Sequence, residues 1–500
     1  MLLILAGVSI AMLTGENGIL NKATTAKQKT EQATAEERVK LEVAGSFGED
    51  GKLDTDLLNE NLRKNIDGLT YNGKAITEKG VADENRIGSL PATVMVDGYE
   101  IMINENGSAS TIIRMAEYQS EDTKPYLPGS NFSQVKGTDL STGLVVTDGT
   151  NYWVWIEVPK TTVFTTATSE TDYTNIETNL ETYTGTLLSR GGYTDEWYDY
   201  YGASYDGNSQ YSQVRFLDAN KFNEAKTYYG AIYSDETGTT PVESFGNEST
   251  TYYVRIDNKL NDNRGCGLTY SEYNSLKETM LSSVYRNGGF WIGQYEAGAD
   301  SYPASANNDT RTLVIKQGAY PYNYITCANA QIKSSQINNG DYTSSLMFGI
   351  QWDLVLKHLQ VRGGMSTDDL TNNSANWGNY YNSTFTIKNG EYTTTPTTAD
   401  SFKPYAEDTS GYVESSTKLQ NKMVLLTTGA NASENCKMNI YDIAGNQWEW
   451  TLEKSPDADD PCTPRGGYYG NSGDYRPASS RYSNYTTTSN NNYSFRSALY

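Results

Sequence analysis

Apolar and polar residues are arranged differently in three successive regions of the chain. Residues 1–13 (MLLILAGVSIAML) carry no charged side chain, but this apolar run is shorter than the ~20 residues that a membrane-spanning helix needs. Residues 19–44 are polar, with Ala, Ile and Val recurring along one side, which predicts an amphipathic helix. We therefore expect residues 1–44 to form one helix, apolar at first and amphipathic afterwards.

Residues 45–126 contain short strand-like segments separated by turns. In the stretch LPATVMVDGYEIMINENG, apolar runs are separated by Asp97-Gly98 and by Glu105-Asn106-Gly107. Such residues favour the tight turns of β-hairpins because they adopt a positive φ at little energetic cost. The pattern predicts a small β-rich domain after the helix.

The third region, residues 127–500, mixes strand and helix patterns, so the predicted fold class is α+β. Large side chains alternate from Tyr152 to Val158, as expected of a strand with both faces occupied. Residues 271–286 and 344–360 have helical spacing, the second through Leu346, Ile350, Leu354 and Leu359.

Two polar, Tyr-rich segments of the third region have no helical period. They are residues 194–212 and residues 372–400. We expect both to be long surface loops or insertions, because such loops carry polar side chains over the surface of a domain.

Length and charge limit the possible partners. A chain of 500 residues is too long for one compact core, so two or more domains are expected. With 39 basic and 61 acidic side chains, the formal net charge is -22, which repels nucleic acid and anionic lipid surfaces. No nucleic-acid partner is predicted.

The composition also excludes several kinds of catalytic site. The chain has 40 Tyr and 44 Gly but one His, His358, and four Cys, namely Cys266, Cys327, Cys436 and Cys462. A single His removes most metal-catalytic sites and Ser-His-Asp triads. We expect His358 to be a satisfied or solvent-facing helical side chain rather than a ligand. Without CxxC spacing a zinc ribbon is improbable, and one or two disulfides of unknown connectivity are possible in an exported chain.

The N-terminal segment LLILAGVSIAMLTGENGILNKATTAKQKT resembles the mature helix of type IV pilin-like proteins of Gram-positive gut bacteria. The resemblance implies association with a membrane or a pilus through this helix, and a small sheet after it. A basic leader and a cleavage glycine are absent, so we expect the chain to begin inside the hydrophobic segment. The alternative is an ordinary surface helix with an apolar end.

Three segments resemble the formylglycine-generating-enzyme family, a variant of the C-type lectin fold. They are GGFWIGQYEAG at 288–298, YDIAGNQWEWT at 441–451, and RGG at 465–467 followed by SFR at 494–496. The resemblance covers roughly residues 127–500. It implies a scaffold role for Trp448, Glu449, Trp450, Arg465, Gly466, Gly467, Phe495 and Arg496.

The residues of the second segment support a strand on their own. Trp448 and Trp450 alternate about Glu449, so a strand there buries aromatic rings on one face and aims a carboxylate at the other. We expect Glu449 to form a charge-assisted bond with Arg465 or Arg496. The alternative is a solvated Glu449 that contributes little to the stability of the fold.

Catalysis of the kind that this family performs is not expected. Those enzymes keep reactive cysteines after the RGG strand, and this chain has no Cys after Cys462. Related iron enzymes need several His ligands, and only His358 exists. We predict no reaction and no cofactor. The fold family would accommodate a structural Ca²⁺ ion, but no run has EF-hand spacing, so no metal-binding residue is assigned.

The C-terminal segment has an unusual composition. Residues 466–500 contain no Lys, Glu, Gln, Met or Trp, and these five types are the ones that codons ending in a pyrimidine cannot encode. Randomised adenines in Asn codons would instead yield Tyr, Ser, Asp, Thr, Gly, Arg and Asn. A Tyr-, Asn- and Ser-rich loop without any special mutational history is the alternative.

This composition resembles the variable region of diversity-generating retroelement target proteins, in which an adenine-mutated cassette diversifies one face of a C-type lectin fold. The resemblance implies a variable segment at 466–496, while Pro477, Ala478 and Leu499 join the scaffold. The ligand-binding positions implied are Tyr468, Gly470, Asn471, Ser472, Tyr475, Arg476, Ser480, Tyr482, Ser483, Asn484, Tyr485, Thr488 and Asn490.

Together these patterns predict a bacterial adhesin or receptor, at the cell surface or outside the cell, in which a pilin-like module presents a C-type lectin-like domain. The expected partner is a protein or carbohydrate on another cell, a host surface or a phage, with a homo-oligomer or filament possible. Alternatives are a structural filament subunit and, less favoured, a formylglycine-generating-type oxidoreductase.

Overall fold

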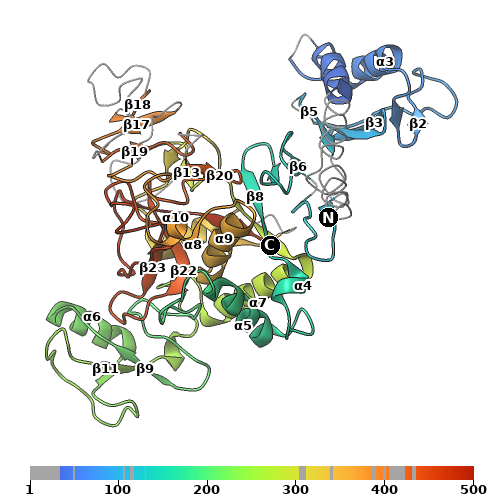
Figure 1. Ribbon diagram of the computed structural model, residues 1–500. Coiled ribbons are helices and arrows are strands. Elements are labelled where there is room, and N and C mark those ends of the chain that lie inside the picture. The colour runs from blue at the N-terminus through green and yellow to red at the C-terminus, as the bar shows by residue number, and fades with distance from the viewer. Residues whose placement is uncertain are drawn as a thin grey trace, which may run out of the picture. The chain divides into compact units, whose positions relative to one another are not determined.

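The computed structural model describes residues 34–48, 51–104, 107–112, 118–129, 131–302, 311–337, 342–383, 390–397, 401–404, 423–430 and 435–500. The apolar run at 1–13 and the helix predicted up to residue 33 lie outside the described residues. Across the described ranges, no helix is both long enough and apolar enough to cross a membrane. The fold is mixed α+β with several small sheets (Figure 1).

The chain forms two compact units, Met1–Glu117 with Ser133–Thr138, and Tyr118–Phe132 with Asp139–Tyr500. The division therefore differs from the boundary predicted at 126/127. The reason is that the segment after residue 118 packs into the second unit, where the Lys124 amide donates to the Asn287 carbonyl at 2.6 Å and Trp155 Nε1 donates to Thr123 Oγ1 at 2.9 Å.

The first unit (blue in Figure 1) combines helix and sheet around one core. Residues 34–44 are helical, and Val39 and Val43 on this helix pack with Val94 and Ile101 of the sheet, so residues 34–44 do not form a module separate from residues 45–126. The sheet order is β2-β1-β3-β4-β5. Its strands are β1 (Thr70–Tyr71), β2 (Lys74–Ala75), β3 (Ala92–Val96), β4 (Tyr99–Ile103) and β5 (Ala109–Ile112), and β6 (Ser133–Gln134) also belongs to this unit.

The predicted hairpin is confirmed. Strands β3 and β4 pair antiparallel about Asp97-Gly98, whose φ values of 51° and 86° are those that a tight hairpin turn requires. The strand pattern did not predict helix α3 (Thr55–Asn65). Asp54 caps the start of this helix, because its side chain accepts hydrogen bonds from two backbone amides of the first turn. Leu58 and Leu62, one turn apart, bury the inner face of this helix.

The second unit is built on a sheet with the order β16-β25-β12-β8-β7. The predicted strand at 152–158 is confirmed as β8, which is buried along most of its length. The last strand, β25, lies between β12 and β16, so the end of the chain is part of the central sheet. The strands are β7 (Val145–Thr147), β8 (Tyr152–Glu157), β12 (Gly289–Gly293), β16 (Ser344–Leu346) and β25 (Ser497–Leu499).

Of the two predicted helices, one is confirmed and one begins later than predicted. The segment 271–286 lies in α7, whose Thr269 and Glu272 form a capping box. The segment 344–360 starts as strand β16, because Leu346 pairs with Ser497, and becomes helix α9 only at Gly349. The helices here are α4 (Lys160–Val163), α5 (Tyr173–Gly185), α7 (Tyr270–Asn287), α8 (Cys327–Ser335), α9 (Gly349–Val361) and α10 (Thr367–Thr371).

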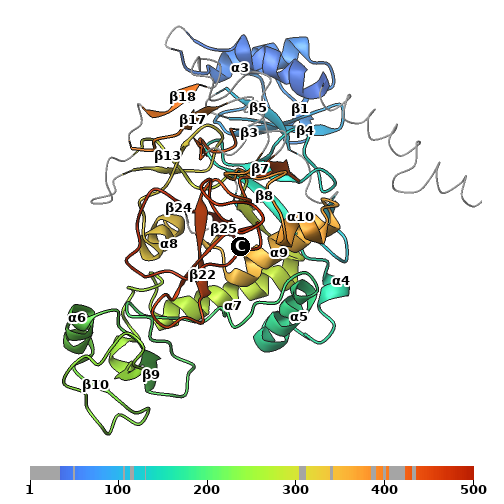
Figure 2. The ribbon, with the colours of Figure 1, turned by 60° about the vertical axis from the view of Figure 1, so that its left-hand side comes forward.

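The first Tyr-rich segment is not a simple surface loop. Trp197 and Tyr198 are buried, and the chain then forms an insert with its own core around Phe216, Phe222 and Tyr252. Figures 1 and 2 both show this insert projecting from one end of the second unit. Its elements are β9 (Tyr211–Val214), α6 (Ala219–Tyr229), β10 (Ile232–Tyr233), β11 (Tyr252–Arg255) and the 3₁₀ helix η2 (Asp257–Lys259).

The second Tyr-rich segment is also partly internal. Trp377 and Tyr380 are buried, and Tyr392 lies in a strand that pairs with Leu426. Residues 384–389 and 398–400 of this segment lie outside the described residues. The remaining short strands of this region are β13 (Gly298–Ala299), β14 (Leu313–Val314), β15 (Tyr320–Pro321), β17 (Glu391–Thr393), β18 (Lys403–Pro404), β19 (Leu425–Leu426), β20 (Cys436–Lys437) and β21 (Ile440–Tyr441).

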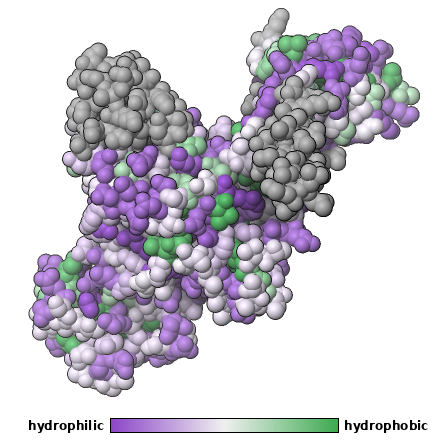
Figure 3. Space-filling view, viewed as in Figure 1, coloured by the Kyte–Doolittle hydropathy of each residue, from purple (hydrophilic) through white to green (hydrophobic). Residues whose placement is uncertain are grey.

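A three-stranded sheet with the order β23-β22-β24 carries the C-terminal motifs. Its strands are β22 (Trp448–Lys454), β23 (Cys462–Arg465) and β24 (Tyr493–Phe495). Helices α8 and α9 both pack against β22, and Figure 2 shows them on opposite sides of it. On the face of the second unit seen in Figure 3, the described residues are mostly hydrophilic, and hydrophobic ones form small separate patches.

Candidate functional site

Two of the three segments that sequence motifs marked meet at β22, and the third lies beside the terminal strand. Strand β23, which ends at Arg465, pairs antiparallel with β22, and β24 pairs parallel with it. Gly289–Gly293 forms β12, which pairs with the terminal strand β25. The predicted scaffold residues are all buried, and all of them except Pro477 and Ala478, which lie in the segment between β23 and β24, are on these strands or directly beside them.

Glu449 forms the predicted ion pair, and its partner is Arg496. Arg496 Nε donates to Oε2 at 2.9 Å and Nη2 donates to Oε1 at 2.6 Å. The alternative of a solvated Glu449 is wrong, because its side chain is buried. Burial raises the pKa of Glu449, and the charge of Arg496 opposes that rise.

Arg465 belongs to a second buried ion network, below the C-terminal segment. Arg465 Nη1 donates to Glu453 Oε2 at 3.1 Å, and its Nη2 donates to Asp353 Oδ1 at 2.8 Å. Arg481 Nε donates to Glu453 Oε1 at 3.0 Å and Arg190 Nη2 donates to the same oxygen at 2.8 Å. Burial opposes ionisation of Glu453, yet the three arginine charges hold its pKa at about 2.

Arg481 is a scaffold residue that sequence reasoning missed. It lies inside the segment predicted to vary, but its guanidinium bonds both Glu453 and Asp353, and its backbone bridges that of Arg465. Composition gives no signal of this role, because arginine is one of the types expected at a varied position. Only the carboxylates brought to it by α9 and β22 distinguish it.

The segment between β23 and β24 is folded, although it has no regular secondary structure. Gly466 and Gly467 adopt φ values of 86° and 78°, and a Cβ on Gly467 would lie 2.6 Å from the Arg476 carbonyl oxygen, so only glycine fits. Trp352 Nε1 donates to the Ala478 carbonyl at 3.0 Å, and Tyr380 Oη donates to that of Gly466 at 2.7 Å. Side chains of α9 and of the second Tyr-rich segment therefore hold the backbone of this segment in place.

Most predicted ligand-binding positions lie at the surface of this segment. Tyr475 is 67%, Tyr482 40% and Tyr485 36% exposed. The other half-buried or exposed positions are Tyr468, Gly470, Asn471, Ser472, Arg476, Ser480, Ser483, Thr488 and Asn490.

Asn484 is the exception, because its side chain is buried. Its Nδ2 donates to Tyr493 Oη at 2.6 Å, and its backbone exchanges two hydrogen bonds with that of Cys462, at 3.0 and 2.9 Å. Asn484 therefore lies inside the segment, bridged to β23, whereas the other twelve predicted positions lie at its surface.

Arg476 stands at the centre of an aromatic group. Its guanidinium carbon lies 4.5 Å from the ring centroid of Tyr475, 5.0 Å from that of Tyr482 and 5.9 Å from that of Trp448. The rings of Trp448 and Tyr482 stack with centroids 5.7 Å apart. Because Trp448 is buried on β22, this cation–π arrangement is attached to the core and holds the arginine in place.

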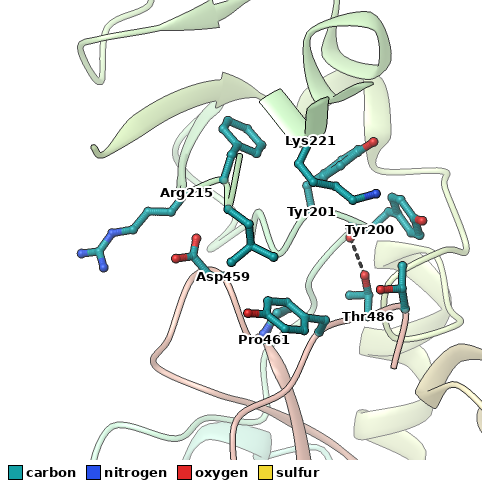
Figure 4. A pocket seen from close by; sticks show the side chains of 11 residues that line it. Tyr200, Tyr201, Arg215, Lys221, Asp459, Pro461 and Thr486 are labelled. Carbon is teal, nitrogen blue, oxygen red and sulfur yellow. Dashed lines mark hydrogen bonds between the residues drawn. The ribbon is translucent and has the colours of Figure 1, made fainter. Parts of the chain in front are cut away.

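A pocket of about 120 Å³ lies at one edge of the same segment (Figure 4). Its wall combines Tyr200, Tyr201 and Phe216 with Tyr485, and Thr486 Oγ1 donates to the Tyr200 carbonyl at 2.7 Å. Arg215 and Asp459 also line it. Burial and the charge of Asp457 raise the pKa of Asp459 to about 6. This pocket is large enough for one small side chain or ring fragment.

The cysteines are not placed for thiolate chemistry. All four are free thiols, so the structure contains no disulfide. Burial raises the pKa of Cys266 to about 12 and that of Cys462 well above its usual value. Tyr198 Oη donates to Cys462 Sγ at 3.4 Å. Buried thiols with raised pKa values are poor nucleophiles.

His358 is also internal. Its Nδ1 accepts from the Glu157 amide at 3.2 Å, and burial, followed by the charge of Arg362, lowers its pKa to about 4. The prediction of a satisfied helical histidine is confirmed for Nδ1, whereas Nε2 finds no hydrogen-bond partner in the described part of the chain.

A structural Ca²⁺ ion is assigned to no residue of the described ranges. Across the described ranges, no three His, Cys, Asp or Glu side chains are grouped to hold a metal ion. Among the buried carboxylates of this region, Glu449 pairs with Arg496 and Asp442 accepts from the Asn435 amide and the Gly429 backbone, whereas Glu296 Oε2 has no hydrogen-bond partner among the described residues. Comparisons with protein-family models, curated proteins and solved structures find no match to this chain.

Proposed function

We propose that this protein is a surface-displayed adhesin or receptor whose C-terminal segment 466–496 binds a partner. The observation that carries the proposal is the contrast within that segment. Three tyrosines that are 36–67% exposed lie on a backbone fixed by buried ion pairs and by glycines that no other residue replaces. A rigid frame with exposed Tyr, Asn, Ser and Arg side chains is the arrangement used in binding loops.

The binding contacts follow from these exposures. Tyr475, Tyr482 and Tyr485 supply large, rigid contact areas, and Arg476 supplies a charge. Asn471, Ser472 and Thr488 supply adaptable hydrogen bonds. The partner is a protein or a carbohydrate on another cell, a host surface or a phage, and the chemistry is binding rather than turnover.

A C-type lectin-like fold of the formylglycine-generating type is part of the same proposal. Three features support it: the terminal strand inserted beside the GGFWIG strand, the WEW strand next to the RGG strand, and the long irregular segment between β23 and β24. A pilin-like N-terminal module would present this domain at the cell surface and associate with a membrane or a filament.

We further propose that a retroelement diversifies the segment. The structure sharpens this idea, because a position can vary freely only where its side chain contributes little to folding. Variation is therefore expected at the twelve surface positions of the predicted set and not at Arg481, Asn484 or Tyr493, whose side chains are buried and form internal bonds.

Deep sequencing of the 3′ end of the gene, across a population of the source organism, tests this. We expect substitutions at Tyr468, Tyr475 and Tyr482, constancy at Arg481 and Asn484, and a near-copy of the segment in the neighbouring DNA. An invariant 3′ end without a near-copy would contradict diversification. Variation that is equally frequent at buried and exposed positions would contradict the structural division.

A binding experiment separates the adhesin from a structural filament subunit. Full-length protein is compared with a variant in which Tyr475, Tyr482 and Tyr485 are replaced by Ser. The adhesin proposal expects unchanged assembly and lost binding to target cells. Assembly that fails in the triple variant, while target binding persists, would favour the filament subunit.

A further inference from the structure

Arg476 differs from the other arginines of the C-terminal strands and segment. Arg465, Arg481 and Arg496 each form an ion pair with a buried carboxylate. Among the described residues, Arg476 forms no ion pair, and its side chain makes one long hydrogen bond, from Nη2 to Tyr475 Oη at 3.4 Å. In a chain with 61 acidic side chains and a net charge of -22, a fixed arginine without a carboxylate partner is unusual.

The ring contacts of Arg476 hold its charge without neutralising it. A cation–π contact restricts the side chain, but it does not take up the N–H groups as hydrogen-bond donors. Four of the five side-chain N–H groups have no protein acceptor among the described residues. A prepositioned guanidinium of this kind matches the planar, two-oxygen geometry of a carboxylate.

The side chains around Arg476 indicate which kind of molecule carries that carboxylate. Asp474, two residues away, is exposed, and its Oδ1 accepts from Asn382 Nδ2 at 3.1 Å. Asn382 Oδ1 accepts from the Gly473 amide at 2.9 Å. Asp474 and Asn382 thus place a carboxylate and an amide at the turn that precedes Arg476, and groups of these kinds form hydrogen bonds with hydroxyl groups.

These surroundings disfavour polyanions. A peptide with several acidic residues, or a nucleic acid, would meet Asp474 and the strongly negative chain, and like charges close together are repelled. A sugar ring with a single carboxylate places its charge on Arg476 and its hydroxyl groups near Asp474 and Asn382. Its C–H face can lie on the exposed ring of Tyr475, which is 67% accessible.

We infer that Arg476, with Tyr475 and Tyr482, forms the anchor for the carboxylate of an acidic carbohydrate, a uronic acid or a sialic acid unit. The inference rests on the proposed binding function of segment 466–496 and names the ligand class for the variant of the segment present in this chain. Arg476 donates two hydrogen bonds to the carboxylate, Tyr475 contacts the ring, and Asp474 accepts from a hydroxyl group.

Immobilised oligosaccharides in matched pairs test the inference. Oligogalacturonate is compared with its carboxyl-reduced form, and sialyllactose with lactose, using the full chain. We expect at least one acidic sugar to bind about tenfold or more tightly than its neutral counterpart, because a hydrogen-bonded charge contributes about 1.5–3 kcal/mol, a factor of roughly 10–150. Arg476→Gln should lose that preference, and Arg476→Lys should keep only part of it, because lysine lacks the two-donor fork.

The matched control is Arg255→Gln, which makes the same change in net charge on β11, where Arg255 pairs with Asp257. It should bind as the wild type does. Melting temperatures of all variants verify folding. The inference is overturned if no acidic sugar binds, if neutral and acidic forms bind equally, or if Arg476→Gln leaves binding unchanged. Binding of acidic peptides alone, sensitive to Arg476→Gln, would also overturn it, yet would leave the proposed binding function intact.

Discussion

Arg496 and Glu449 form an ion pair with two hydrogen bonds, at 2.9 and 2.6 Å, and both side chains are buried. The same guanidinium donates to the Gly293 and Tyr441 carbonyls, each at 2.8 Å. One side chain near the end of the chain thus connects β12, β21 and β22. Because β25 follows directly, this pair fixes the terminal strand in the central sheet.

Removing one partner of this pair should strongly destabilise the fold. Glu449→Ala leaves Arg496 buried and uncompensated, so we expect the free energy of unfolding to fall by about 3–5 kcal/mol. Urea denaturation measures it. Glu224→Ala is the control, because Glu224 pairs with Lys221 at the surface and such pairs contribute about 1 kcal/mol or less. Equal losses in the two variants would contradict a structural role for the Glu449–Arg496 pair.

The same substitution, Tyr to Ser, should have different effects on stability at the exposed binding face and in the buried scaffold. Tyr475→Ser removes an exposed ring and should change stability by about 0.5 kcal/mol or less. Tyr493→Ser removes a buried ring that stacks on Trp450 with centroids 4.7 Å apart, and it should destabilise by about 3 kcal/mol or more. Thermal unfolding of the two variants measures both effects. Similar melting temperatures would contradict the division.

Gly467→Ala should disturb the frame beneath Arg476. The φ of 78° at this position is strained for alanine, and the new Cβ would lie 2.6 Å from the Arg476 carbonyl and 2.8 Å from the Tyr380 ring. We expect a loss of about 1–3 kcal/mol together with weaker ligand binding. Gly318→Ala is a suitable control, because its φ of 76° is similar but its Cβ would meet no atom within 4 Å. If Gly318→Ala lost more stability than Gly467→Ala, the contact of the new Cβ with neighbouring atoms would not be the cause of the loss.

His358 should make stability depend on pH. Burial lowers its pKa from 6.5 to about 4, so between these values the unfolded chain binds more protons than the folded one. Stability contributed by the neutral imidazole is therefore present above about pH 6.5 and is lost as the pH falls through about 4, by about 3 kcal/mol in total.

Unfolding of wild type and His358→Gln across pH 4–7 isolates this effect, because His358 is the one histidine of the chain and the carboxylates are common to both. The difference between the two profiles should change by about 3 kcal/mol over that range. Parallel profiles, or an imidazole NMR signal that titrates near 6.5 in the folded protein, would contradict the assignment.

Local patterns predicted those elements that need few distant contacts. The Asp97-Gly98 turn, the strand from Tyr152 and helix α7 all follow from spacing and turn chemistry within a short window. The strand around Glu449 was also predictable, because two tryptophans alternate about a carboxylate. The sequence left two possible partners for Glu449, Arg465 and Arg496, because no local pattern favours one of these arginines over the other.

Predictions failed where a distant segment decided the outcome. Leu346 fits a helical stripe, but pairing with Ser497 makes it part of a strand. Trp197 and Trp377 occur in polar, Tyr-rich stretches whose composition is typical of surface loops, yet their side chains are buried. Asn484 has the composition of a contact residue, and a bond to Tyr493 makes it internal.

The sequence by itself determined the α+β class, the local strands, turns and helix, the buried WEW strand, and the unusual composition of residues 466–500, because these depend on residue types and their spacing. Only the tertiary structure decided that Arg465, Arg481 and Arg496 pair with buried carboxylates and that Arg476 forms no ion pair with any described residue. It also decided which side chains of the C-terminal segment are exposed. Both depend on α9, β22 and the second Tyr-rich segment meeting in space, and residues so far apart in the chain leave no mark on each other's local pattern.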